Sequence, residues 1–168
     1  PFASLKQLAG RGLSLTNITD INAGLESVSL FKEPAAVVIK HNTPCGIALG
    51  TTAKTALERA IEADPESAFG AVLVLNCPLD LETANVIAQF REVKRGNIDI
   101  IAGTIVLADA LTLLTKVRKT MGIYTFGKIP QKKTSHLNLK WIRGGFALQV
   151  SDDDIDRGFK DWKIVTKK

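Results

Sequence analysis

The chain has 168 residues, of which 45% are hydrophobic and 23% are charged, and its net charge is +5. This composition predicts one globular domain, residues 1–168, with a buried core, and it excludes a disordered chain. No apolar run is long enough to cross a bilayer, and two cysteines, Cys45 and Cys77, are too few for a disulfide scaffold or a four-thiolate zinc site. We therefore expect a reducing, cytoplasmic location and no membrane partner.

The start of the chain indicates a fragment of a longer protein. Pro1 stands where a complete chain would begin with methionine, and the residues that follow lack the apolar stretch of a signal peptide. The sequence leaves open whether the chain is a natural short protein or a fragment.

Apolar runs alternate with helical patterns in the first part of the chain. Residues 13–15 predict a short strand, and Asn17 or Thr19 is expected to cap a helix over residues 20–31. Residues 35–39 (AAVVI) are typical of a strand buried on both faces, and the segment HNTPCGIALG after them is predicted to be a loop.

The remaining predicted helices cover residues 52–63, 80–93 and 107–120, and the remaining strands cover residues 71–75, 98–102, 123–126, 140–142, 146–150 and 162–165. Thr51 or Thr52 and Asp80 are the expected N-caps. Residues 127–140 are predicted to be loop-like, and Arg143-Gly144-Gly145 a turn or bulge. Strands that alternate with helices of 10–15 residues predict an α/β fold, with a largely parallel or mixed sheet between helix layers.

Candidate site residues lie where strands end. In open α/β sheets, ligands bind beyond the carboxyl ends of the strands. The strand at residues 35–39 ends in Lys40-His41, the next is preceded by Ser67-Ala68-Phe69-Gly70 and ends at Asn76, and the third contains Asp99 and ends at Gly103.

Lys40 and His41 are the strongest candidates for chemistry. A cation and an imidazole directly after the apolar residues 35–39 are costly unless they are exposed or used. Both reach one pocket only if the chain bends, and Pro44 and Gly46 are expected to supply that bend. The Lys40 ammonium should favour a neutral His41, the form that a general base needs. The alternative is a solvated lysine and a histidine that bonds a loop carbonyl.

A catalytic zinc site is not expected. Zinc-dependent nucleobase deaminases carry H-x-E and P-C-x-x-C motifs. In this chain, Thr43 stands where the glutamate would follow His41, and Ala48 stands where a second cysteine would follow Cys45. Glycine-rich phosphate-binding motifs and a serine triad are absent from the sequence as well.

The segment between Asp109 and Asp152 has no acidic residue. Its basic residues are Lys116, Arg118, Lys119, Lys128, Lys132, Lys133, Lys140 and Arg143. Two interpretations stay open: a solvated basic face, or a surface that attracts an anionic metabolite, cofactor or nucleic acid.

Four segments, in order along the chain, resemble a known family. They are KQLAGRGLSLTNITDINAGLESV from Lys6, AAVVIKHNTPCGIALG from Ala35, ADPESAFGAVLVLN from Ala63 and DWKIVTKK from Asp161. They are similar to the first half of the AICAR transformylase domain, which occurs in the bifunctional purine protein that also carries IMP cyclohydrolase. Residues 103–140 match this family poorly, and the resemblance implies no site residue among them.

The resemblance implies a cytidine-deaminase-like fold without zinc, and formyl transfer from the co-substrate 10-formyltetrahydrofolate to the 5-amino group of AICAR. It implies that His41 is the catalytic base and Lys40 its catalytic neighbour. Gly70, with Phe69 and Ser67 beside it, would bind the nucleotide, and either Asp99 or Glu92 would be the acidic nucleotide contact.

The resemblance also implies partners. A homodimer, or association with the second half of the domain, is expected, and the chain alone should be inactive. Two other functions stay open: a non-catalytic fragment or subunit that retains nucleotide binding, and a basic nucleic-acid-binding module, which we consider the weaker alternative.

Overall fold

The computed structural model describes residues 2–90, 97–129, 137–151, 163 and 165. It consists of two compact units, Pro1–Pro130 and Gln131–Lys168, and each unit is described by itself.

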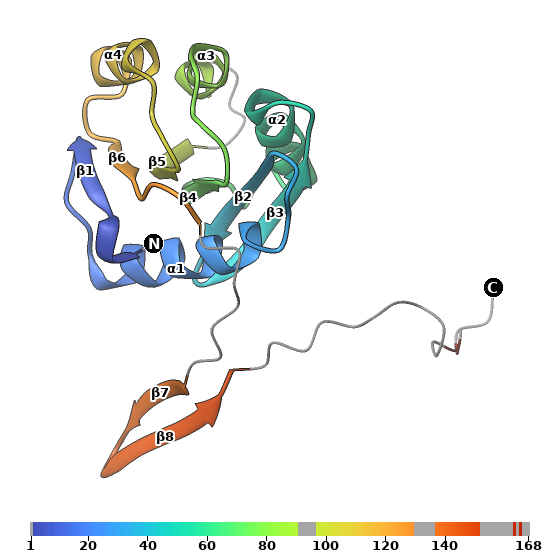
Figure 1. Ribbon diagram of the computed structural model, residues 1–168, viewed down its shortest axis with the longest axis vertical. Coiled ribbons are helices and arrows are strands. Elements are labelled where there is room, and N and C mark those ends of the chain that lie inside the picture. Colours follow the sequence, from blue (N-terminus) through green and yellow to red (C-terminus); the bar gives the residue numbers. More distant parts are fainter. Residues whose placement is uncertain (1, 91–96, 130–136, 152–162, 164, 166–168) are drawn as a thin grey trace. The chain divides into compact units, whose positions relative to one another are not determined.

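A six-stranded sheet forms the centre of the first unit. Its strand order is β1-β6-β5-β4-β2-β3 (Figure 1). The strands are β1 (Lys6–Ala9), β2 (Ala35–Lys40), β3 (Thr43–Leu49), β4 (Phe69–Leu75), β5 (Asn97–Gly103) and β6 (Gly122–Thr125). β4, β5 and β6 run parallel, whereas β2 is antiparallel to β4, β3 to β2 and β1 to β6. Of the two predicted alternatives, the sheet is therefore the mixed one.

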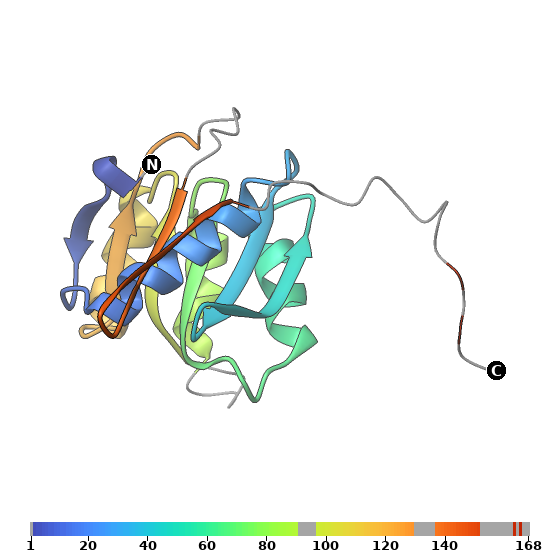
Figure 2. The ribbon, with the colours of Figure 1, turned by 90° about the horizontal axis from the view of Figure 1, so that it is seen from below.

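Helices cover both faces of this sheet. Helix α1 (Leu15–Val28) lies on one face, and α2 (Ala53–Ala63), α3 (Leu81–Gln89) and α4 (Ala108–Val117) lie on the other (Figure 1). Figure 2 views the sheet from the side that α1 covers. A short 3₁₀ turn, Phe2–Ser4, precedes β1. The predicted three-layer α/β fold is confirmed.

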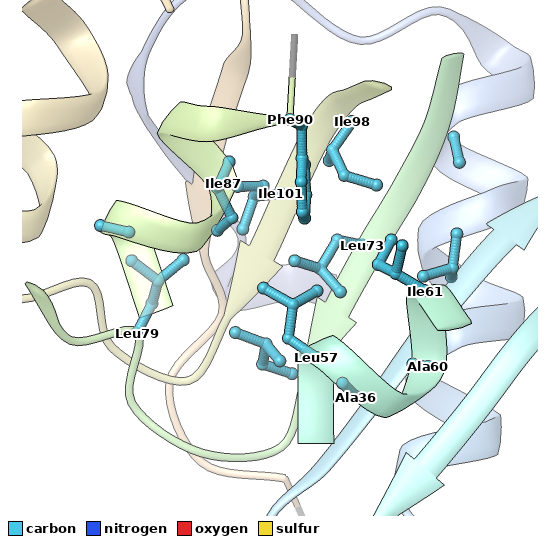
Figure 3. Packing of buried hydrophobic residues seen from close by; sticks show 14 of the residues in the cluster. Ala36, Leu57, Ala60, Ile61, Leu73, Leu79, Ile87, Phe90, Ile98 and Ile101 are labelled. Atoms are coloured by element: carbon cyan, nitrogen blue, oxygen red, sulfur yellow. The ribbon is translucent and has the colours of Figure 1, made fainter. Parts of the chain in front are cut away.

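Each face of the sheet has its own apolar core. On the side of the three helices, Leu57 of α2, Leu73 of β4, Ile87 of α3 and Ile101 of β5 pack together (Figure 3). On the side of α1, Ile21 and its neighbours pack against β2, β4, β5 and β6. The apolar runs of the central strands are therefore buried on both faces, as their continuous patterns predict.

The start of α1 differs from its prediction. The strand predicted at residues 13–15 is wrong, since Ser14 is the N-cap of α1 and the first strand is β1 instead. The Ser14 hydroxyl accepts the Asn17 backbone N–H at 3.3 Å, and the Asn17 side chain accepts the Ser14 N–H at 3.1 Å. This reciprocal capping box moves the helix start ahead of both predicted caps, Asn17 and Thr19.

The loop predicted after β2 is wrong, because residues 43–49 form β3. β3 pairs with β2 from Lys40↔Thr43 to Ala35↔Leu49, so the two strands form a tight hairpin. Pro44 fits because β3 is the last strand of the sheet, where a missing backbone donor costs little. Gly46 is not a bend either: its Cα packs against α2, where a side chain would meet the Ala60 carbonyl oxygen.

Replacing Gly46 by alanine should therefore destabilise the fold. An alanine Cβ would lie 1.9 Å from the Ala60 carbonyl oxygen, and that oxygen can yield only if α2 shifts. We expect the free energy of unfolding to fall by about 1–3 kcal/mol, the usual cost of overpacking. Denaturant unfolding measures it, with Gly12→Ala as the control, because a Cβ at Gly12 meets no atom within 4 Å. Equal effects of the two substitutions would contradict the packing argument.

The later elements agree with prediction in type but differ in their ends. Thr52 and Asp80 cap α2 and α3 through their side chains, as predicted. α4 is shorter than residues 107–120, and the end of the predicted helix 80–93 lies partly outside the described residues. Half of the strand predicted over residues 162–165 also falls outside them, and the two residues described there, Lys163 and Val165, are not in a strand.

The second unit contains a two-stranded hairpin, β7 (Leu137–Ile142) and β8 (Gly145–Val150). The turn predicted at residues 143–145 is confirmed, but residues 137–140 are strand rather than loop. Three apolar cross-strand pairs explain the difference: Leu137↔Val150, Leu139↔Leu148 and Trp141↔Phe146. The rings of the last pair meet edge to face, 5.8 Å apart.

Among the described residues, the structure contains no helix whose length and apolar character would allow it to span a membrane.

Candidate functional site at one edge of the sheet

The reversed direction of β2 decides which residues meet. Because β2 is antiparallel to β4, the end of β2 lies beside the start of β4, and β5 starts beside β4 in parallel. Lys40, His41, Phe69, Gly70 and Asp99 therefore belong to one edge of the sheet. Asn76 and Gly103, which also end strands, lie at the opposite edge. The expectation that ligands bind beyond the carboxyl ends of the strands would therefore have placed residues from opposite edges in one site.

Asn76 has a structural role at that opposite edge. Its side-chain oxygen accepts the Ala35 N–H at 2.7 Å, and its side-chain nitrogen donates to the Glu33 and Phe31 carbonyl oxygens at 2.9 and 3.2 Å. The amide therefore ties the start of β2 to the end of β4.

His41 and Asn42 form the two-residue turn between β2 and β3. Both have positive φ angles, 54° and 63°, which is the backbone of a type I′ hairpin turn. Side chains other than glycine adopt this region at a cost, although histidine and asparagine enter it more often than most. The bend predicted at Pro44 and Gly46 is therefore at His41 and Asn42 instead. His41 is exposed, and its ring makes no hydrogen bond within the described part of the chain.

Side chains of helix α1 hold this turn in place. The Asp20 carboxylate accepts the Asn42 backbone N–H at 2.7 Å. The Asn42 side-chain amide, with its nitrogen toward the acceptors, donates to the Thr19 hydroxyl at 2.8 Å, to Asp20 Oδ1 at 3.2 Å and to the Thr19 carbonyl oxygen at 3.3 Å. Asp20 itself is buried.

Lys40 bridges two strands at the same edge. Its Nζ donates to the carbonyl oxygen of Phe69, the first residue of β4, at 2.9 Å. An ammonium group has three N–H donors, so this bond leaves donors for a ligand. The lysine is half-buried, unlike the freely solvated lysine of the alternative interpretation.

Ser67 and Cys45 extend the edge beside Lys40. The Asp64 carboxylate accepts the Ser67 backbone N–H at 3.0 Å, and hydrogen bonds from Ser67 lower the pKa of Asp64. Cys45 is the extra residue of a bulge in β3, and its Sγ donates a long hydrogen bond (3.9 Å) to the Ser67 carbonyl oxygen. Burial, followed by the negative charge of Asp64, raises the pKa of the Cys45 thiol.

Neither cysteine should be a fast nucleophile. Burial, with a smaller contribution from the Asp80 carboxylate, raises the pKa of Cys77 to about 11, and the pKa of Cys45 is raised as well. Because the thiolate is the reactive form, alkylation by iodoacetamide near pH 7.5 should be slower than that of a free cysteine, and it should accelerate as pH rises. Mass spectrometry of the wild type and of Cys45→Ser measures each site. Modification of Cys77 at the rate of an unfolded peptide thiol would contradict this expectation.

Gly70 and Asp99 face each other across β4 and β5. Gly70 has a φ of 73°, and a Cβ added there would meet only Asp99 Oδ2, at 3.9 Å. The Asp99 carboxylate forms an ion pair with Arg11 and accepts the Asn97 side-chain N–H at 3.1 Å. Glu92, the alternative acidic residue, lies outside the described residues.

Arg118 does not belong to a solvated basic face. It is 6% exposed and donates to the Ile87 and Ile98 carbonyl oxygens and to the Asn97 side chain. Lys116, Lys119, Lys128, Lys140 and Arg143 are exposed, and Lys132 and Lys133 lie outside the described residues.

The described residues contain no group of three or more His, Cys, Asp and Glu side chains arranged to hold a metal ion. The expectation that no zinc is bound stays a prediction.

Sequence reasoning missed three contributors to this edge: Asp20, Asn42 and Arg11. Asn42 had a local signal, because a polar pair that tolerates positive φ, between two apolar runs, is typical of a two-residue hairpin. Asp20 and Arg11 had none, since their partners Asn42 and Asp99 lie far along the chain.

The fold and this edge define a three-layer α/β protein with a polar site where β2 ends and β4 and β5 begin. The chain matches the sequence model of the family described as AICARFT/IMPCHase bienzyme over residues 1–168. It therefore belongs to this family of bifunctional enzymes of purine biosynthesis.

Proposed function

We propose that this chain provides the Lys40–His41 part of a site that transfers the formyl group of 10-formyltetrahydrofolate to the 5-amino group of AICAR. The observation that carries the proposal is the convergence of these two residues with Gly70 and Asp99 at one sheet edge, in a chain of the AICARFT/IMPCHase family. The chain would then be the first half of a transformylase domain.

The chemistry needs a base and an anion-stabilising donor. The AICAR amine is a weak nucleophile, so its proton has to leave as the new N–C bond forms, and the imidazole of the exposed His41 can accept it. The formyl oxygen becomes negative in the tetrahedral intermediate, and a free N–H of Lys40 can donate to it. When the bond from carbon to N10 of the folate breaks, the protonated His41 returns its proton to that nitrogen.

The neighbouring residues suit the nucleotide. Gly70 has no side chain, so a ligand can approach its backbone closely. Asp99 offers carboxylate oxygens to hydroxyl groups. Phe69, which is 47% exposed, directly precedes Gly70, and Ser67 lies two residues before Phe69. We expect a homodimer, or the second half of the domain, to complete the folate side of the site.

Titration calorimetry and a turnover assay test this proposal in the natural protein that carries this chain. We expect saturable AICAR binding, and release of tetrahydrofolate only when AICAR and 10-formyltetrahydrofolate are both present. A random oligonucleotide serves as the comparison ligand. Oligonucleotide binding that weakens steeply with salt, with no AICAR binding, would overturn the proposal in favour of a nucleic-acid-binding module.

A further inference from the structure

Two consecutive residues with positive φ need support from outside the turn. A type I′ turn is most stable with asparagine and glycine, and His41 occupies its first central position instead. A strained backbone of this kind persists where surrounding contacts over-determine it. The direction of the His41 side chain depends on this backbone, so whatever holds the turn also aims the imidazole.

Beyond the Lys40↔Thr43 strand pair that closes it, the turn is held, within the described residues, by side chains of the first half of α1. Asp20 accepts the Asn42 backbone N–H at 2.7 Å, the shortest restraint on the turn, and together with Thr19 it receives the Asn42 side-chain amide. Because Asp20 is buried, removing its carboxylate would leave the Asn42 N–H without its acceptor and free the turn to relax.

The helix that carries Asp20 is fixed at two points. α1 is fixed at its start by the Ser14–Asn17 capping box and packs on the sheet through Gly24, whose Cα lies so close to Val74 that a Cβ would be 2.4 Å from the valine side chain. Asp20 is thus anchored to β4, the strand that also carries Gly70.

We propose that Asp20 is a positioning residue for His41, which it serves by holding the His41–Asn42 turn through Asn42. This inference rests on the proposed role of His41 as the base. Asp20 acts through Asn42 rather than on the substrate, so its loss should affect the transition state more than nucleotide binding.

The kinetic test compares Asp20→Ala, Asp20→Asn and Asp80→Ala in the natural protein that carries this chain. Asp20→Ala should lower kcat for formyl transfer by about 10- to 100-fold, the cost of a small misplacement, while KM for AICAR changes by less than about threefold. Asp20→Asn keeps an oxygen acceptor for the Asn42 N–H and should restore most of kcat.

Asp80→Ala is the matched structural control. Asp80 also accepts a backbone N–H, from Thr83 at 2.9 Å, but it caps α3 at the opposite edge of the sheet. Its loss should lower Tm and leave kcat unchanged. A kcat for Asp20→Ala equal to that of Asp80→Ala, with both proteins folded, would overturn the proposal.

A second measurement separates this inference from the proposed function. Hydrogen exchange of the Asn42 amide and the NMR resonances of the His41 ring report on the turn without any turnover. In Asp20→Ala the Asn42 amide should exchange faster, and the His41 resonances should shift, whereas Asp80→Ala should change neither. If the wild type shows no formyl transfer, the proposed function fails. Independently of turnover, an unchanged exchange rate of the Asn42 amide and unchanged His41 resonances in Asp20→Ala would overturn the positioning role.

Discussion

Replacing His41 should abolish most formyl transfer while leaving AICAR binding nearly intact. We expect His41→Asn to lower kcat by about 10²–10⁴-fold, the usual loss when a general base is removed. Asparagine is the suitable substitution, because it tolerates the positive φ of 54° at this position and therefore keeps the turn. The Kd for AICAR should change much less, since proton transfer belongs to the transition state.

Steady-state kinetics and calorimetry on the natural protein measure the two quantities. Glu62→Ala, on an exposed position of α2, is the control for unspecific effects of mutation. If His41→Asn retained kcat within about threefold of the control, His41 would not be the base, and the proposed mechanism would fail at its central step.

Replacing Arg118 should cause a large loss of stability. Its guanidinium donates to the Ile87 carbonyl oxygen of α3 at 3.1 Å, to the Ile98 carbonyl oxygen of β5 at 2.8 Å and to the Asn97 side chain. Arg118→Ala would leave these acceptors without a charged donor in a buried environment. We expect the free energy of unfolding to fall by about 3 kcal/mol or more, and Tm by roughly 10 °C.

Thermal unfolding followed by circular dichroism measures this loss. Lys119→Ala is the matched control, because Lys119 is the next residue along the chain and is exposed. A Tm shift for Arg118→Ala no larger than that of Lys119→Ala would show that the buried hydrogen bonds do not carry the stability.

The same substitution should reach the candidate site. Arg118 holds the Asn97 side chain, and Asn97 in turn donates to Asp99, which faces Gly70. The buried arginine therefore connects α4 to the acidic residue of the proposed nucleotide contact, although in the sequence it counts only as one member of a basic stretch.

Local patterns in the sequence determined the class of the fold. The continuous apolar runs at residues 35–39 and 71–75 indicated buried strands, because only a sheet covered by helices on both sides can bury such runs. The segment 98–102, which Asp99 interrupts, indicated a third strand. The side chains of Thr52 and Asp80 marked two helix starts, since an N-cap acts on the backbone only two or three residues away.

The tertiary structure decided the composition of the candidate site. An apolar run does not reveal the direction of its strand, so the sequence does not show that β2 is antiparallel to β4. This direction places Lys40 beside Phe69 and Gly70 rather than beside Asn76. The contacts of Asp20 with Asn42 and of Arg11 with Asp99 join residues 22 and 88 positions apart (42 − 20 and 99 − 11). Such contacts depend on the packing of α1 and on the order of strands in the sheet. The sequence indicated Lys40 and His41 as the candidate residues for chemistry, but only the folded chain shows which residues lie around them.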